Sequence, residues 1–343
     1  MKTPIIEESL QLEDQKLTFQ IGKLARSADI AVMGRVGDTC VLVTVVTAPA
    51  REDIDYLPLQ VEYAEKLYAG GRIKGSRWVK REGRSSDDAI LKARLIDRSI
   101  RPLFPKQFRK TVQIIITLLS VDGVNSPEIL AANAVSAALH CSQIPWDGPI
   151  ATSRVAYVGE NGEGTIVPHP VESEQKFSKL DLIVASTKKK VVMIETEAEE
   201  LSEDIVLDAL AVAQKENEKI IEFIESLRKK AGKPKEELKE STTDAKLETV
   251  LKGEFKTELN ELIESRASKE FEDKSVLDRL ISSVTEKYKD EFDRKSIAKT
   301  VESIIKTMIQ DSVLKSGKRI DGRGPDEIRE ITCEVSTLPR THG

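Results

Sequence analysis

Residues 70–110 read GGRIKGSRWVKREGRSSDDAILKARLIDRSIRPLFPKQFRK, and the rest of the chain is organised around this stretch. It holds thirteen Lys or Arg against four Asp or Glu, a net charge of +9; because the whole chain carries −5, the remainder carries −14. The positive charge surrounds Trp78 in a loop with four glycines: Gly70, Gly71, Gly75 and Gly83. Cationic side chains attract phosphates, and an indole offers a flat face to a base. The stretch therefore predicts a clamp for single-stranded nucleic acid.

A helix is predicted from Asp87 to Arg101. Ser85 and Ser86 precede it as N-caps, and Pro102 marks its end. One face is apolar and points to the core, and it consists of Ala89, Ala93, Ile96 and Ile100. The opposite face carries Arg94, Arg98 and Arg101 at i, i+4 and i+7, so three guanidinium groups line one wall of the clamp. The alternative is that these arginines pair with acids such as Asp97 or with carboxylates elsewhere in the fold.

Two runs in this stretch carry a resemblance to a known family. Residues 80–84 (KREGR) and 94–105 (RLIDRSIRPLFP) resemble the first core domain of the bacterial polynucleotide phosphorylases. In that family the first of two RNase PH-like domains carries an aromatic-aromatic-basic-Arg loop at the mouth of a trimeric ring, where it grips single-stranded RNA. Residues 78–81 (WVKR) occupy that place here. Val79 departs from the pattern because it cannot stack on a base, so base contact is expected to depend on Trp78.

The candidate RNA-binding residues combine the loop and the helix. They are Trp78, Lys80, Arg81, Arg84, Arg94, Arg98 and Arg101.

Composition places the chain among soluble proteins. With 343 residues and 39% hydrophobic content it can bury one large or two medium cores. No apolar run approaches the ~20 residues of a membrane span, and the acidic N-terminus differs from a targeting peptide, so a cytoplasmic location and no membrane partner are expected. Cys40, Cys141 and Cys333 are far apart and lack metal-ligand spacing, so neither a disulfide nor zinc is expected.

The order of elements predicts an α+β core domain over residues 1–233, with mixed sheets packed with helices. Residues 17–46 predict several short strands, and residues 111–120 (TVQIIITLLS) predict a buried strand. A small-residue helix follows over residues 129–141, then two strand pairs at 150–167 and 180–196, and a long helix from Ser202 to Gly232. Together with the resemblance, this order gives an RNase PH-like fold.

Polar residues inside these elements are interpreted as structural. Asn133 and Ser136 lie on an Ala-rich helix, where small polar side chains usually serve packing. His140 and His169 lack partners at catalytic spacing. The three lysines of residues 188–190 are interpreted as a solvated turn.

Residues 234–314 predict a small all-helical domain, since apolar residues recur at helical intervals among many Lys and Glu. Residues 315–343 are expected to be the truncated start of a second RNase PH-like domain. Residues 17–28 (LTFQIGKLARSA) align with 331–342 (ITCEVSTLPRTH) through a Thr, a Leu and an Arg, so a strand is predicted over Ile331–His342.

Phosphorolysis needs an anion site for phosphate and acids that hold a divalent metal. The resemblance implies inorganic phosphate as co-substrate and Mg²⁺ as cofactor, with the groups that hold them in the second core half. No catalytic residue and no metal ligand is nominated in this chain. Asp53 and Asp55 are the nearest approach to an acid pair, but such a pair in a polar loop is usually solvated.

Two functions remain open at this point. The first is an enzyme: the RNA-gripping N-terminal portion of a polyribonucleotide nucleotidyltransferase that degrades RNA from the 3′ end in mRNA turnover, inactive as this chain alone. The second is a non-catalytic RNA-binding or ring-forming scaffold. A lone RNase PH-like subunit is disfavoured by the helical segment and by the restart at Gly317. The resemblance implies a homotrimer, single-stranded RNA as ligand and RNA-degradation complexes as partners.

Overall fold

The computed structural model describes residues 4–13, 15–49, 56–73, 75, 84–159, 163–238, 245–267, 274–289 and 291–340. The chain divides into two compact units, Met1–Lys239 and Glu240–Gly343. Each unit is described by itself. No helix among the described residues is long and apolar enough to cross a membrane.

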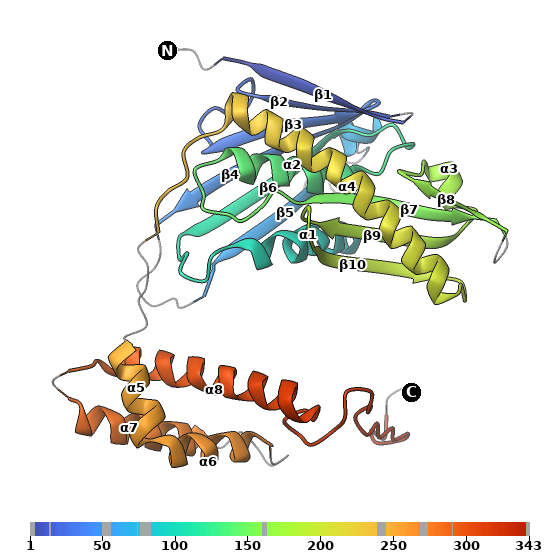
Figure 1. Ribbon diagram of the computed structural model, residues 1–343. Coiled ribbons are helices and arrows are strands. Elements are labelled where there is room, and N and C mark those ends of the chain that lie inside the picture. The colour runs from blue at the N-terminus through green and yellow to red at the C-terminus, as the bar shows by residue number, and fades with distance from the viewer. Residues whose placement is uncertain are drawn as a thin grey trace. The chain divides into compact units, whose positions relative to one another are not determined.

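The first sheet contains six strands in the order β1-β2-β3-β4-β6-β5 (Figure 1). Their bounds are β1 Ile6–Leu12, β2 Gln15–Ile21, β3 Ile30–Val36, β4 Thr39–Ala48, β5 Leu59–Glu65 and β6 Thr111–Ser120. All neighbours are antiparallel except β5 and β6, which run parallel. The buried strand predicted at residues 111–120 is confirmed as β6. It alternates buried and half-buried positions because its sheet is covered on one face more deeply than on the other.

A 3₁₀ turn and a helix come after β5, the edge strand of this sheet. The 3₁₀ turn η1, Leu67–Gly70, leaves β5, and α1, Asp87–Ile100, packs against β5. A second 3₁₀ turn, η2, Arg101–Leu103, continues from α1 because Pro102 cannot extend the helix. The helix predicted from Asp87 is therefore confirmed, with its end one residue earlier.

The second sheet contains four antiparallel strands in the order β10-β9-β7-β8. Their bounds are β7 Ala151–Val158, β8 Thr165–Pro168, β9 Ser178–Ser186 and β10 Val191–Ala198, with the short helix α3, Glu172–Gln175, between β8 and β9. Both predicted strand pairs are confirmed as hairpins.

Helices α2, Pro127–Cys141, and α4, Glu203–Ala231, join the two sheets. α2 contacts β3, β4 and β7, and α4 contacts α2, β7 and β9 (Figure 1). Almost every residue of α2 is buried, which its small side chains permit because they allow close approach to the sheet. The α+β prediction is confirmed, with mixed sheets packed with helices.

The described residues of the second unit form four helices: α5 Ala245–Glu254, α6 Lys256–Ala267, α7 Lys274–Lys287 and α8 Arg294–Ser316. Their apolar faces share one core, which includes Leu251, Val284 and Val301, each 0% exposed. Asp293 caps α8 by accepting from the backbone N–H of Ser296 at 2.9 Å. The amphipathic pattern of this segment thus predicted its helices correctly.

The prediction of a strand over Ile331–His342 is wrong for residues 331–340, the part that the structure describes. Described residues 317–340 form turns and irregular backbone without a strand, and the apolar side chains of Ile331, Val335 and Leu338 are 78%, 91% and 63% exposed. A strand needs a neighbour to satisfy its backbone groups, and no other strand is found among the described residues of this unit. The local sequence pattern does not show whether such a neighbouring strand is present.

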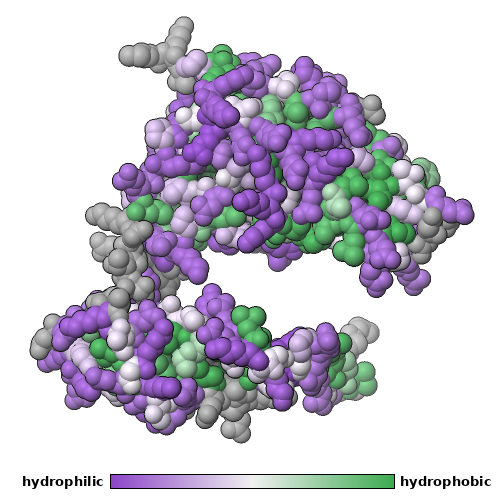
Figure 2. Space-filling view, in the orientation of Figure 1, coloured by the Kyte–Doolittle hydropathy of each residue, from purple (hydrophilic) through white to green (hydrophobic). Residues whose placement is uncertain are grey.

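Hydrophilic side chains dominate the face shown in Figure 2, as expected for a chain in which 32% of residues are charged. Exposed large apolar residues on the first unit include Phe177 and Leu207, at 77% and 60% exposure.

Candidate functional site

Helix α1 is positioned by its cap and by its apolar face. The Ser86 hydroxyl accepts from the backbone N–H of Ala89 at 3.1 Å, and Asp87 and Asp88 lie in the first turn, where the helix dipole favours acids. The predicted core-facing stripe is confirmed, since Ala89, Ala93, Ile96 and Ile100 are all buried. The opposite face is therefore held at the surface.

That face brings three of the candidate arginines to one cleft. A cleft of about 620 Å³ runs along α1, and Arg94, Arg98 and Arg101 line it together with Glu195. Arg98 donates to Glu195 on β10 and to the sulfur of Met193 at 3.4 Å. An ion pair that joins α1 to β10 thus occupies one of the three guanidinium groups.

Arg101 is held more firmly than Arg98. Its Nε and Nη2 donate to the two carboxylate oxygens of Asp97, each at 2.6 Å, and its guanidinium also reaches the carbonyl oxygens of Leu57 at 3.4 Å and Leu59 at 3.2 Å. The hydrogen bonds to Asp97 outweigh partial burial and raise the pKa of Arg101. Arg98 and Arg101 therefore have the acid partners that the alternative interpretation predicts.

Arg94 and Arg84 differ from those two. Both side chains are exposed, and among the described residues no hydrogen bond or ion pair involves either guanidinium group. They can therefore meet a phosphate without first breaking a protein contact. Trp78, Lys80 and Arg81 lie outside the described residues, so the loop part of the candidate site stays a prediction.

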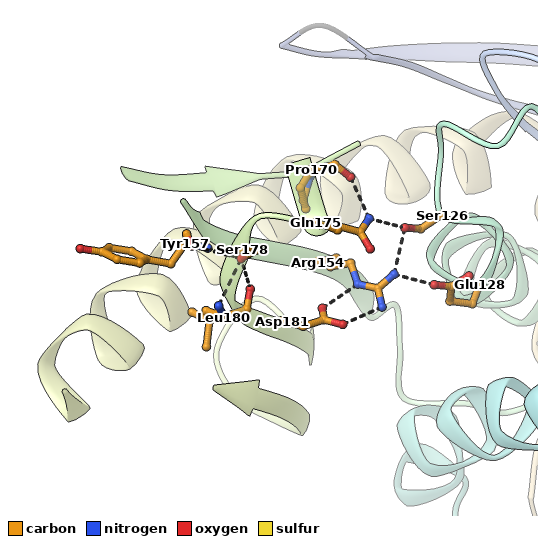
Figure 3. A network of polar contacts seen from close by, with 9 residues as sticks. All are labelled: Ser126, Glu128, Arg154, Tyr157, Pro170, Gln175, Ser178, Leu180 and Asp181. Atoms are coloured by element: carbon orange, nitrogen blue, oxygen red, sulfur yellow. Dashed lines mark hydrogen bonds and ion pairs between the residues drawn. The ribbon is translucent and has the colours of Figure 1, made fainter. Parts of the chain in front are cut away.

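A second polar site lies at the start of α2 and was missed by the sequence analysis (Figure 3). Arg154 on β7 donates through Nε and Nη2 to both carboxylate oxygens of Asp181 on β9, at 2.7 and 2.9 Å. Its Nη1 donates to Glu128 at 2.7 Å and to the Ser126 hydroxyl at 3.0 Å. Gln175 then donates to the same hydroxyl at 3.2 Å.

The guanidinium group of Arg154 is enclosed by these partners. The side chains of Arg154 and Glu128 are only 16% and 11% exposed, whereas that of Asp181 is 42% exposed. Burial lowers the pKa of Arg154, but Asp181 and Glu128 outweigh burial and raise it above its ordinary value. Four of the five guanidinium N–H donors are engaged, so Arg154 fixes α2 to the second sheet and has little capacity left for a ligand.

A cleft of about 570 Å³ opens beside this cluster. Lys92, Arg154, Glu128 and Asp181 line it, so cations and acids are mixed and the cleft has no strongly positive wall. Among the described residues, no group of three or more His, Cys, Asp or Glu is arranged to hold a metal ion. The sequence did contain a clue, because a lone Arg or Asp in an apolar strand must find a partner.

The polar residues of α2 are confirmed as packing positions. Asn133 donates to the carbonyl of Thr152 at 2.8 Å and accepts from its N–H at 2.9 Å. Ser136 exchanges the same pair of bonds with Ile150, at 2.6 and 3.1 Å. These four bonds attach α2 to the start of β7.

Two consecutive family models match the first unit. The model described as "3' exoribonuclease family, domain 1" matches residues 13–145, and the model described as domain 2 of that family matches residues 148–216. The chain belongs to the 3′ exoribonuclease family. The boundary between the two matches falls between α2 and β7, so the domain 1 match covers β2 to β6 of the six-stranded sheet and the domain 2 match covers the four-stranded sheet.

Relatives named polyribonucleotide nucleotidyltransferase align along nearly the whole chain. The one from Halothermothrix orenii is 41% identical over 340 residues, covering 96% of this chain and 47% of the relative. Those from Caldicellulosiruptor saccharolyticus and Thermus thermophilus are 42% and 40% identical, each covering 97% of this chain and 47% of the relative. The resemblance inferred from residues 80–105 is thus confirmed, and this exoribonuclease-family chain spans about half the length of the curated relatives it matches.

Proposed function

We propose that this chain is the RNA-gripping portion of a cytoplasmic polyribonucleotide nucleotidyltransferase, which degrades single-stranded RNA from the 3′ end by phosphorolysis and releases nucleoside diphosphates. The observation that carries the proposal is the 41% identity to a polyribonucleotide nucleotidyltransferase over 96% of the chain. The charge of residues 70–110 supports it, because a net +9 within a chain of −5 suits an anionic polymer.

The grip divides its arginines into two roles. Arg84 and Arg94 contact RNA phosphates, since both are exposed and neither has a partner among the described residues. Arg98 and Arg101 line the same face, but they form ion pairs with Glu195 and Asp97 and stabilise the position of α1. Trp78 supplies the stacking face, and Lys80 and Arg81 add charge beside it.

Fluorescence anisotropy with labelled oligo(A), measured between 50 and 200 mM salt, tests the grip. Each phosphate contact with a single strand contributes about −0.7 to the slope of log K against log salt. The double variant R84A/R94A should bind more weakly and lower the slope by about 1.4, while K189A, which removes an exposed charge from the β9–β10 turn, should leave the slope unchanged. Equal effects of the two variants, or none, would refute the grip.

The co-substrate phosphate and Mg²⁺ belong to the whole enzyme in this proposal. The resemblance places the groups that hold them in the second core half, so no step of the reaction is assigned to this chain. We therefore expect this chain alone to bind RNA without cleaving it. Release of nucleoside diphosphates from poly(A) upon addition of phosphate and Mg²⁺ to the purified chain would contradict this expectation and would assign it catalytic residues of its own.

The homotrimer implied by the resemblance is part of the same proposal. Size-exclusion chromatography with light scattering should give a molar mass three times the 38.1 kDa of one chain. A monomer that still binds oligo(A) with the salt slope above would show that RNA binding does not require ring formation and would contradict the homotrimer. Partner proteins of RNA-degradation complexes are part of the same proposal.

A further inference from the structure

Oxygen atoms from three residues converge on one cation at the start of α2. Figure 3 shows the guanidinium group of Arg154 between Asp181 on one side and Glu128 and Ser126 on the other. Nε and Nη2 donate to the two carboxylate oxygens of Asp181 at 2.7 and 2.9 Å. Nη1 donates to Glu128 at 2.7 Å and to the Ser126 hydroxyl at 3.0 Å. Acidic and hydroxyl oxygens around one positive charge are the surroundings that a hard metal ion takes in proteins.

The convergence point faces open space. The cleft of about 570 Å³ is lined by all four of these residues. The side chain of Asp181 is 42% exposed, so its carboxylate also meets solvent, and that of Glu128 is 11% exposed. A small ion with bound water can therefore reach both carboxylates from the cleft once the guanidinium group is removed.

The two carboxylates, Glu128 and Asp181, are neutralised by Arg154. Their ion pairs among the described residues are those with this guanidinium group. Lys92 lines the same cleft, but its ammonium group pairs with two other acids, Glu65 at 3.0 Å and Asp88 at 2.5 Å. The charge of Lys92 is therefore balanced on α1 and β5, away from the two carboxylates.

The sum of the charges shows what the guanidinium group replaces. Two carboxylates and one guanidinium group sum to −1, whereas the two carboxylates alone would sum to −2. A divalent cation would bring that sum to zero. Mg²⁺ in proteins is commonly bound by one or two carboxylates, with water completing its shell. Arg154 belongs to the chain and cannot dissociate, so its charge stays between the carboxylates at any metal concentration.

We propose that Arg154 takes the position of a divalent cation between Glu128 and Asp181 and thereby closes the cleft of the first unit to metal ions. The family resemblance implies Mg²⁺ as cofactor, but this carboxylate pair does not fit Mg²⁺ while the guanidinium group lies between the two side chains. A ligand in this cleft therefore meets a fixed cation that can donate hydrogen bonds but cannot activate a water molecule as a metal ion does. This inference goes beyond the proposed function and does not rest on the grip of α1.

Removal of the guanidinium group should create a metal site. Mn²⁺ is the probe, because it accepts the oxygen ligands that Mg²⁺ takes and its electron paramagnetic resonance separates free from bound ion. R154A should bind one Mn²⁺ with an affinity at least about tenfold above that of the wild type. R154A/D181N lacks one of the two carboxylates and should lose this gain. The matched control R98A leaves a single exposed carboxylate, that of Glu195, without its arginine and should gain no Mn²⁺ binding.

Thermal unfolding gives a second readout. Mn²⁺ at about ten times its Kd should raise the Tm of R154A by about 3–6 °C and leave that of the wild type unchanged. If R154A is unfolded in EDTA, Mn²⁺ should restore its circular dichroism spectrum, because metal binding then contributes the missing folding energy. KCl at equal ionic strength should replace Mn²⁺ in neither assay.

Three results would overturn the proposal. The first is Mn²⁺ binding by R154A no tighter than that by the wild type or by R98A. The second is a gain that persists in R154A/D181N, since the site would then lie elsewhere. The third is an R154A chain that stays unfolded when Mn²⁺ is added.

Discussion

Replacing Arg154 by methionine should lower the free energy of unfolding of the first unit by about 3 kcal/mol. Methionine fills much of the same volume but leaves the carboxylate of Glu128, 11% exposed, without its 2.7 Å partner. Breaking a buried ion pair typically costs about 3–5 kcal/mol, and the lower figure applies because neither side chain is wholly enclosed. Asp181 is 42% exposed, so water can solvate its carboxylate after Arg154 is removed. Its lost ion pair therefore adds at most about 1 kcal/mol to the destabilisation.

Urea unfolding followed by the emission of Trp146 measures this loss. Trp146 is 4% exposed in the first unit, and a W78F background removes the other tryptophan of the chain. For a unit of this size, the loss corresponds to a fall in Tm of about 6–12 °C. The matched control D181N should cost about 1 kcal/mol, because Arg154 keeps Glu128.

The double variant R154M/E128Q decides the cause. Glutamine is uncharged, so the double variant has no unpaired buried charge and should recover most of the stability lost in R154M. A loss below 1 kcal/mol in R154M, or a double variant less stable than the single one, would refute the view that the buried Glu128 carboxylate sets the energy.

Three further outcomes are expected. G232A should destabilise the first unit by about 1–3 kcal/mol in urea unfolding, because the added Cβ would lie 2.5 Å from the carbonyl oxygen of Arg228. Burial and neighbouring cations hold the pKa of His140 near 3, below its ordinary 6.5, so between these pH values the unfolded chain binds a proton that the folded chain does not. The free energy of unfolding should therefore fall by up to about 1.4 kcal/mol per pH unit as the pH drops below 6.5, and H140Q should flatten that slope. R101K should cost about 0.5–1 kcal/mol in the same assay, because lysine cannot form the two-pronged contact with Asp97 and the pair is partly exposed.

Local elements could be predicted from the sequence because local interactions form them. Residues 111–120 are mostly apolar and rich in β-branched side chains, which favours a strand, and the strand has those same bounds. Helix α1 follows from its Ser86 cap, its acidic first turn and its apolar stripe, all within fifteen residues. The strand predicted near Ile331 failed for the complementary reason, since a strand also needs a neighbour that the local pattern does not specify.

The polar sites depended on contacts between distant parts of the chain. The sequence placed three arginines on one face of α1 and showed the excess of positive charge around them, which are properties of spacing and composition. Only the folded chain determined that Arg98 meets Glu195, 97 positions away, and that Arg154 is enclosed by two carboxylates from α2 and β9. Pairing of charges is decided by which elements pack together, because ion pairs act over a few ångströms and the sequence does not give those distances.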